Sequence, residues 1–468
     1  MSKKPKSSGA SEKVQKKQRL NLGRFLGALA VSLIVWLWYR PNHILFASDT
    51  ENYFRGLEGL LKDGIFSDAT NLYYWPSGYP ILMWPFATLT LNYFAFIVGT
   101  FQILFFIFSI YYFVIQLQHT IFNRLFWPIS LFLSFNPTLA LNAPAIGYEV
   151  NVASCFLLAL GAFLKFQNQP QKNLRSREIW YAATAFSIAT FMQPRISILA
   201  LSFFLIWSLA EFKLTVALLM ILSTSFIVAL GPLFMIARNL EANNFAAVST
   251  NLGTTMNIGA GPQSTGGYTN KATGVPCPQV QGNAAMQDSH LIRCVLKWYK
   301  EHPRQTVALF MRKFQYHWSP WFGPLANGTT ARSPWLDIHP LNSTIQTKEG
   351  AKFVFGNAGI LISWIWIIGS MALMLMGFKT LWQIRGLPKV LATLLLVPVM
   401  LNSASSIVTI GDNRFRIPTL TLSLLLQLFG AYSLLASRQV KKWSLSQPDS
   451  TWESLNWKKN SEKDSLPT

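Results

Sequence analysis

Long apolar runs separated by short polar stretches dominate the pattern of hydrophobic and polar positions along this chain. Runs of this length cross about 30 Å of hydrocarbon as helices, and the alternating strand pattern of a membrane β-barrel is not visible. The pattern therefore predicts an all-α polytopic membrane protein with about ten transmembrane helices. They are expected near residues 22–39, 93–117, 124–141, 149–166, 179–193, 196–212, 214–237, 355–378, 389–408 and 417–436, where Pro194-Arg195 can also be interpreted as a kink in one longer hairpin.

Basic residues are distributed unevenly around these runs. They gather before the first run, in the loops near 165–177 and 379–389, and after the last run. Because basic residues mark the cytoplasmic side of a span, both termini of this multi-pass chain are expected inside. The predicted parts are a basic cytoplasmic tail (1–21), a transmembrane bundle (22–237) with a first outer loop (40–92), a small extracytoplasmic segment (238–354), C-terminal transmembrane helices (355–436) and a disordered cytoplasmic tail (437–468).

The first outer loop contains a predicted amphipathic helix. Ser48 and Glu51 match the spacing of a capping box, and Gly64 is suited to end the helix. An apolar stripe at helical spacing lies between them, at Phe54, Leu57, Leu60 and Leu61. A helix of this kind is expected to lie on the outer leaflet.

Composition and charge narrow the class of partner. The chain has 468 residues, of which 51% are hydrophobic and 13% charged, which is too apolar for an ordinary soluble protein. A net charge of +21 can indicate nucleic acid, but here the basic residues flank the spans and form no patch within a soluble fold. No nucleic acid is therefore expected as a partner, whereas anionic membrane lipids are.

The pattern of motifs, cysteines and histidines predicts no cofactor and no metal. A glycine-rich phosphate loop, a dinucleotide fingerprint and a zinc-binding pattern are all absent from the sequence. Cys277 and Cys294 both lie in the extracytoplasmic segment, where a disulfide can form. From the sequence, they are either bridged or two unrelated thiols.

Ionisable residues form a ring at the predicted outer ends of the spans. Charges near the membrane are costly and tend to mark function, although a carboxylate at a helix start and an arginine reaching lipid headgroups have structural explanations. Because Ser48 and Glu51 account for the helix start, Asp49 is free to point elsewhere. The ring consists of Asp49, Glu149, Arg195, Arg238, Asp412, Arg414 and Arg416.

Together these residues suit one chemistry. Arginines bind phosphate oxygens, often through two parallel hydrogen bonds, and a carboxylate near them stays ionised and can act as a general base. A phosphate-linked lipid would place its headgroup at this depth and its tail among the spans. Arg414 is the first candidate for the phosphate, with Arg238 and Arg195 behind it. Arg416 ranks lower because it can instead pair with Asp412.

Several short motifs lie in a fixed order along most of the chain. They are Asp49 with Tyr53, Pro76-Ser77-Gly78-Tyr79-Pro80, Asn136-Pro137 before Tyr148-Glu149, Gln193-Pro194-Arg195, Arg238-Asn239, Ser249-Thr250-Asn251-Leu252-Gly253, Gly259-Ala260-Gly261-Pro262, Gly266-Gly267-Tyr268 and Arg414-Phe415-Arg416-Ile417-Pro418. In this order they resemble the GT-C membrane glycosyltransferases, specifically the branch of dolichyl-phosphate-mannose–protein mannosyltransferases and the bacterial aminoarabinose transferase. The candidate substrate-binding residues are Tyr53, Tyr79, Arg195, Arg238, Arg414 and Arg416.

The resemblance implies an inverting transferase that takes a sugar from a polyprenyl-phosphate donor and passes it to an extracytoplasmic glycan, lipid or protein. The family's catalytic aspartate maps onto Asp49, and its second acidic position maps onto Glu149. Many members carry adjacent Asp and Glu, whereas Thr50 here separates Asp49 from Glu51, so the base is open between these two carboxylates. A bacterial cytoplasmic membrane is the expected location.

A transporter, or a flippase for lipid-linked glycans, is the alternative function. Transporters usually place their ionisable groups near the midplane of the membrane, often in two related halves. Here the charges gather at one predicted face, and no internal repeat is visible. The sequence therefore favours a glycosyltransferase over a transporter.

Overall fold

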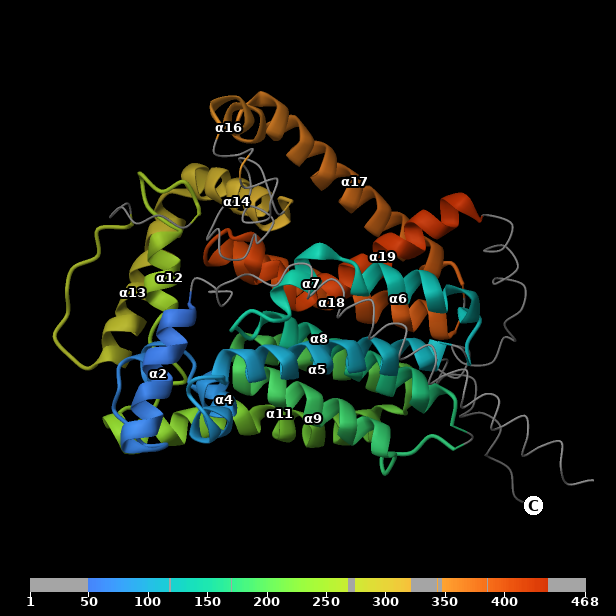
Figure 1. Ribbon diagram of the computed structural model, residues 1–468, viewed down its shortest axis with the longest axis horizontal. Coiled ribbons are helices and arrows are strands. Elements are labelled where there is room, and N and C mark those ends of the chain that lie inside the picture. Colours follow the sequence, from blue (N-terminus) through green and yellow to red (C-terminus); the bar gives the residue numbers. More distant parts are fainter. Residues whose placement is uncertain are drawn as a thin grey trace, which may run out of the picture.

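The computed structural model describes residues 49–117, 119–169, 171–267, 274–320, 343, 347–384 and 386–436. Within these ranges the regular secondary structure is helical, and the only β-bridge is an isolated one between Gly267 and Gly411. The helices form a bundle with further helices gathered at one end (Figure 1). The predicted span 22–39, both predicted tails and Ser48 lie outside the described residues.

Seven described helices are long and apolar enough to cross a membrane. This agrees with seven of the predicted spans but does not confirm a count of about ten. The seven are α5 (Phe94–Leu117), α8 (Glu149–Gln167), α10 (Ser197–Glu211) with the preceding turn η2 (Pro194–Ile196), α11 (Leu214–Asn243), α17 (Asn357–Trp382), α18 (Leu387–Val408) and α19 (Ile417–Leu435) with the preceding turn η5 (Asn413–Arg416).

Two further predicted spans are not among these seven helices. The run 124–141 contains the turn η1 (Asn123–Leu125) and two helices, α6 (Phe126–Ser134) and α7 (Pro137–Asn142). The break has a local cause, because the side chain of Asn136 accepts a hydrogen bond from the backbone of Leu139 and Pro137 starts a new helix. The run 179–193 is the 16-residue helix α9 (Arg177–Met192), which is separate from α10 because Gln193 is extended before Pro194.

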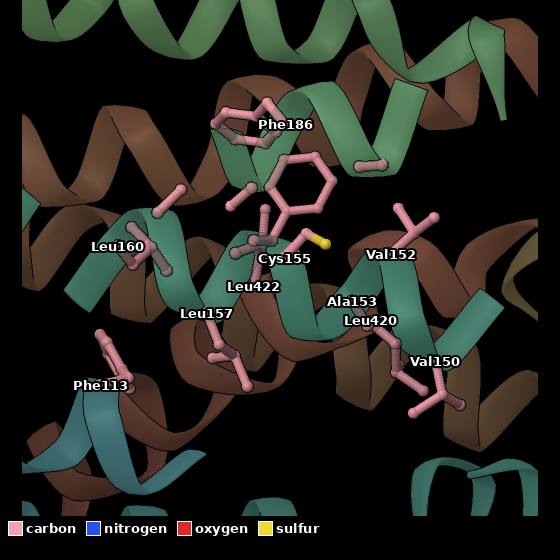
Figure 2. Close-up of a cluster of buried hydrophobic side chains, with 14 of the residues drawn as sticks. Phe113, Val150, Val152, Ala153, Cys155, Leu157, Leu160, Phe186, Leu420 and Leu422 are labelled. Atoms are coloured by element: carbon pink, nitrogen blue, oxygen red, sulfur yellow. The ribbon is translucent and has the colours of Figure 1, made fainter. Parts of the chain in front are cut away.

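The core of the bundle surrounds α8. Cys155, Leu157 and Leu160 of α8 are fully buried, and Figure 2 shows them on this helix with Phe186 of α9 on one side and Phe113 of α5 on the other. Helices α17 and α19 approach so closely that a Cβ atom on Gly377 would lie 1.9 Å from the carbonyl oxygen of Leu426. Small residues at such crossings allow membrane helices to pack by van der Waals contact.

The predicted first outer loop contains α2 (Thr50–Asp63), α3 (Asn71–Tyr74) and α4 (Gly78–Leu89). The predicted amphipathic character of α2 is found, since Leu57 and Leu60 are buried and the helix ends at Gly64 with φ of +74°. The predicted capping role of Glu51 is not found, because its carboxylate is exposed and pairs with Arg55 at 2.5 Å.

The predicted extracytoplasmic segment contributes α12 (Leu252–Ile258), α13 (Ala284–Glu301), α14 (Pro303–Trp318) and α16 (Lys348–Phe355). We call residues 245–320 the cap. Its small core includes Met256, Trp298 and Leu309. Cys277 and Cys294 are joined by a disulfide, which resolves the question that the sequence left open.

Candidate functional site

A cavity of about 620 Å³ opens where the cap meets one end of the bundle. Seven separate parts of the chain line it: the start of α2, the end of α3 with the residues after it, the residue before α8, the turn η2 with the residues before it, the cap, the end of α18 with the residues after it, and the turn η5. Four of the residues in the predicted ring reach this cavity. They are Asp49, Arg195, Asp412 and Arg414.

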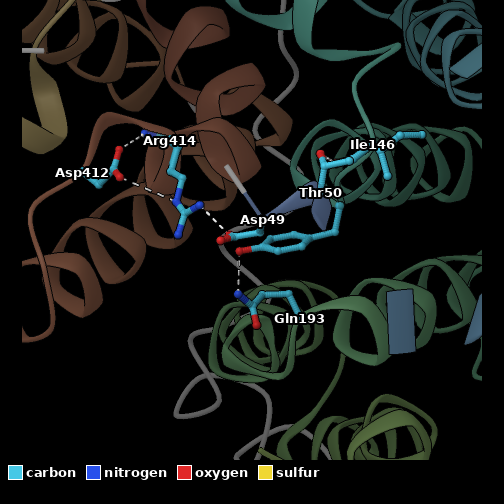
Figure 3. Close-up of polar contacts among 7 residues, drawn as sticks. Asp49, Thr50, Ile146, Gln193, Asp412 and Arg414 are labelled. Carbon is cyan, nitrogen blue, oxygen red and sulfur yellow. Dashed lines mark hydrogen bonds and ion pairs between the residues drawn. The ribbon is translucent and has the colours of Figure 1, made fainter. Parts of the chain in front are cut away.

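An ion pair between Asp49 and Arg414 forms one wall of the cavity. Asp49 Oδ2 accepts a hydrogen bond of 2.5 Å from Arg414 Nη1, and both side chains are about nine-tenths buried. Asp49 is free to do this because it occupies the cap position of α2 without a side-chain capping bond. Figure 3 shows the two side chains pointing toward each other from opposite sides.

Asp412 holds Arg414 in place from behind. Its Oδ1 accepts a hydrogen bond of 2.9 Å from the backbone N–H of Arg414, which caps the turn η5, and its Oδ2 lies 3.6 Å from Arg414 Nε (Figure 3). Burial raises the pKa of Asp412 to about 6, Arg414 opposes this shift, and the negative charges of Asp49 and Glu149 add to it. Arg414 is therefore oriented by two carboxylates.

Arg195 is a second cation at the cavity, and it lacks such partners. Its Nε and Nη2 atoms are buried and make no hydrogen bond to the described residues. The guanidinium stacks on the ring of Phe415, with Cζ 4.3 Å from the ring centroid, and Arg414 lies 4.9 Å from the same centroid. Because buried N–H groups nearly always have partners, this guanidinium is the best candidate for an external anion.

Tyr148 and Gln193 complete the polar wall next to Asp49. Gln193 Nε2 donates a hydrogen bond of 2.8 Å to Tyr148 Oη, and both residues line the cavity. Gln193 is the extended residue that ends α9, so the break between α9 and α10 brings both Gln193 and Arg195 to the cavity. Both residues lay in the sequence motifs, but only Arg195 was singled out.

Arg238 has a different environment from the one predicted. It is fully buried at the end of α11 and does not line the cavity. Its guanidinium donates to the backbone carbonyls of Ile65, Ser67 and Leu72, with Nε 3.1 Å from Ile65 O. These contacts hold residues 65–72 against α11, so the donors of Arg238 are already used.

Arg416 and Tyr79 also bind protein groups away from the cavity. Arg416 Nη1 donates 2.9 Å to the carbonyl of Trp318, and the predicted pairing with Asp412 is not found. Tyr79 Oη donates to Gln102 and accepts from the backbone N–H of Gly147, both at 2.8 Å. Both residues are therefore placed to support the walls.

The remaining predicted residues differ in their access to the cavity. Tyr53 lines it and packs on Tyr79 with ring centroids 4.9 Å apart. Glu149 is buried at the first turn of α8, directly after the cavity residue Tyr148, and does not itself line the cavity. Glu51 is exposed and lies outside the lining as well.

The cap contributes a carboxylate that sequence analysis did not identify. Asp288 on α13 is 8% exposed and lines the cavity. Its Oδ1 accepts a hydrogen bond of 2.7 Å from the backbone N–H of Gly253, and burial raises its pKa. Nothing in the sequence marks it, because a single Asp at the start of an amphipathic helix is common. Further cap and loop residues on this wall are Tyr74, Trp75, Ser249, Asn251, Thr254 and Thr255.

Comparisons with known proteins add little to this picture. No family model matches the chain, and no curated protein matches it. One solved structure, the oligosaccharyltransferase of Archaeoglobus fulgidus tethered to an acceptor peptide, aligns over 92% of this chain and 52% of its own, with 13% identity and a TM-score of 0.41. The chain thus spans about half the length of that protein, and a match at this level carries no argument about fold or activity.

Proposed function

We propose that this chain is an integral membrane glycosyltransferase of the GT-C type that uses a polyprenyl-phosphate sugar. The observation that carries the proposal is the content of one cavity at the end of an apolar bundle. It holds a buried carboxylate, Asp49, and two guanidiniums, one of which, Arg195, makes no hydrogen bond through its buried Nε and Nη2 to the described residues. A base beside an anion site is the set of groups that transfer from a lipid phosphate requires.

In the proposed reaction, Asp49 takes the proton of an acceptor hydroxyl as its oxygen attacks the anomeric carbon of the sugar. The bond between that carbon and the phosphate oxygen breaks, and polyprenyl phosphate leaves with the electron pair. The configuration at the anomeric carbon is inverted, because the acceptor oxygen attacks from the face opposite the departing phosphate. Arg195 offsets the negative charge of the departing phosphate, and Arg414 orients the carboxylate of Asp49.

The structure changes the ranking of the proposed phosphate ligands. Arg414 is already paired with Asp49 and Asp412, so Arg195 becomes the first candidate. Arg238 and Arg416 leave the set because neither lines the cavity. The guanidinium of Arg238 also donates to carbonyls of the protein, and Nη1 of Arg416 donates to the carbonyl of Trp318. Glu149 is proposed to act through its charge near Asp412 rather than by contact with substrate.

The cap wall is proposed to receive the sugar. It presents amide, hydroxyl and carboxylate groups from Asn251, Thr254 and Asp288, together with the aromatic rings of Tyr74 and Trp75. Sugar hydroxyls hydrogen-bond to groups of the first kind, and the apolar face of a sugar ring packs on aromatic side chains. The wall that holds Arg195 and Arg414 therefore suits the phosphate of the donor, and the wall formed by the cap residues with Tyr74 and Trp75 suits its sugar.

Purified protein in nanodiscs tests the function. We would add polyprenyl phosphates carrying radiolabelled mannose, glucose or galactose, with a membrane extract of the host as the acceptor source. We expect at least one donor to release polyprenyl phosphate and to label a product. A transporter, reconstituted in vesicles, would instead move the intact lipid from one leaflet of the bilayer to the other without breaking a bond. Failure to bind any of these lipids, or polyprenyl phosphate itself, would refute the proposal.

Asp288→Asn tests the cap wall. The amide oxygen of Asn can still accept from Gly253, so the local fold is kept while the charge is lost. A hydrogen bond to a charged group contributes about 1.5–3 kcal/mol, so binding of the active sugar lipid should weaken about tenfold or more. Polyprenyl phosphate, measured as a competitor, should bind as before. The matched control is Asp63→Asn on the exposed face of α2; equal loss for both ligands would place Asp288 outside the sugar site.

A further inference from the structure

A fully buried lysine joins the cap to the end of α18. Lys313 lies on α14, in the cap, and has 0% of its surface exposed. Helix α14 packs against both α18 and η5, and Figure 1 shows it crossing above this part of the bundle. Lysine is among the residues most rarely buried, so its position needs a physical explanation.

The contacts of Lys313 supply that explanation. Its Nζ donates to the carbonyl of Thr409 at 2.8 Å and to Tyr299 Oη at 2.8 Å, and lies 3.5 Å from the carbonyl of Val408. Tyr299 Oη donates in turn to Val408 O at 3.0 Å. Helix α18 ends at Val408, where the last carbonyls of a helix have no partner within the helix. Two residues of the cap therefore complete the end of a bundle helix.

The backbone beyond Thr409 is packed equally tightly against the cap. Gly411 donates its N–H to the carbonyl of Gly266 at 2.9 Å. A Cβ atom on Gly411 would lie 2.6 Å from Lys313 Cα, and one on Gly259 would lie 2.2 Å from the carbonyl oxygen of Thr409. The cap thus holds residues 409–411 at several points, immediately before the cavity residues of η5.

We propose that Lys313 is a positioning residue, a latch through which the cap fixes the end of α18 and thereby sets the places of Asp412 and Arg414 in the cavity. The latch itself stands on these contacts alone. Its consequence for sugar transfer rests on the function proposed above, because it acts through the residues that orient Asp49.

The charge of Lys313 gives the latch a pH dependence. Burial lowers the pKa of Lys313 to about 7 from its ordinary value of 10.5. Within the described residues it has no ion-pair partner. The titratable group that contacts it is Tyr299 of α13, whose own pKa burial raises, while the α18 end offers only carbonyls and Asp412 is paired with Arg414. A neutral amine has two N–H donors, which is enough for the two bonds of 2.8 Å.

The sign of the effect follows from linkage. In the opened state Lys313 is in water and binds a proton below its ordinary pKa of 10.5, whereas in the closed state it binds one only below about 7. Closing is therefore most favourable at high pH, weakens as the pH falls from 10.5 to 7, and stays constant below 7. Across this window the change is about tenfold per pH unit.

Hydrogen exchange in nanodiscs measures the latch without any substrate. The readout is the protection of peptides covering residues 405–416, corrected for the intrinsic effect of pH and compared with a peptide from α8. In the wild type we expect protection at 405–416 to fall about 25-fold from pH 8.5 to pH 6.5, because the equilibrium changes about tenfold per unit down to pH 7 and little below it. Lys313→Met should lower protection at pH 8.5 by about tenfold, as expected for lost hydrogen bonds, and should remove the pH dependence.

Two further variants keep the inference falsifiable. Arg312→Met changes the exposed neighbour on α14 and should behave as wild type. Tyr299→Phe keeps the ring but removes one partner of Nζ, so it should weaken protection at 405–416 less than Lys313→Met does. If Lys313→Met does not fold, Tyr299→Phe still tests the latch. Wild-type protection at 405–416 that is independent of pH and unchanged in Lys313→Met or Tyr299→Phe would overturn the latch, whatever the chain catalyses.

Discussion

Asp49→Asn is expected to reduce sugar transfer by about 10²–10⁴, the usual cost of losing a general base. The amide is isosteric with the carboxylate and can still accept a hydrogen bond from Arg414, whose second partner, Asp412, remains. The fold and the binding of polyprenyl phosphate should therefore be kept. The measurement is product formation per mole of purified protein, with gel filtration and thermal unfolding as checks of the fold.

Glu51→Gln is the matched control for this prediction. Glu51 is two residues from Asp49, but it is exposed and paired with Arg55 on the outer face of α2. We expect its replacement to change turnover by less than about twofold, since exposed ion pairs contribute little. An inactive Glu51→Gln beside an active Asp49→Asn would move the base to Glu51 and would contradict the proposed geometry.

Arg195→Ala is expected to weaken the binding of polyprenyl phosphate by about ten- to a hundredfold, because a charge-assisted hydrogen bond to phosphate contributes about 1.5–3 kcal/mol. Arg195→Lys should restore only part of the affinity, because an ammonium group lacks the planar fork of a guanidinium. The buried Nε and Nη2 of Arg195 have no protein partner among the described residues, so the substitution breaks no hydrogen bond of the protein at these two atoms. The assay is equilibrium binding of a labelled polyprenyl phosphate in nanodiscs.

Arg238 and Arg55 separate this effect from a general loss of positive charge. Arg238→Met should lower the unfolding temperature and leave affinity largely intact in the folded fraction, because Arg238 binds the backbone carbonyls of Ile65 and Leu72 outside the cavity. Arg55→Ala removes an exposed cation and should change neither quantity. Unchanged affinity in Arg195→Ala together with a loss in Arg238→Met would reverse the two roles assigned here.

The sequence was most informative where one local signal decides the structure. Apolar run length identified seven helices that are long and apolar enough to cross a membrane, and the amphipathic pattern located α2 together with its end at Gly64. The same criterion failed at 124–141, because run length takes no account of Asn136-Pro137, which begins a new helix. For Arg238, sequence alone cannot distinguish a phosphate from a cluster of backbone carbonyls, since both attract a guanidinium.

The contacts between residues that lie on different sides of the cavity could not be predicted from the sequence. No sequence feature near Asp49 or Arg414 indicates that these two residues pair. The burial of Lys313 likewise depends on how α14 packs on α18. Asp288 reaches the cavity only because α13 packs beside α12. These contacts depend on tertiary packing, whereas helix periodicity only shows which side of a helix is apolar.

The pairing of Asp49 with Arg414 also has a consequence for biogenesis. The two residues are 365 positions apart, and a ribosome makes that length in about 20–70 s at 5–20 residues per second. Throughout that time Asp49 has no Arg414 to pair with. The cavity is therefore among the last parts of the protein to be completed, and a chain released before η5 is synthesised would contain its early helices and yet lack the ion pair that forms one wall of the cavity.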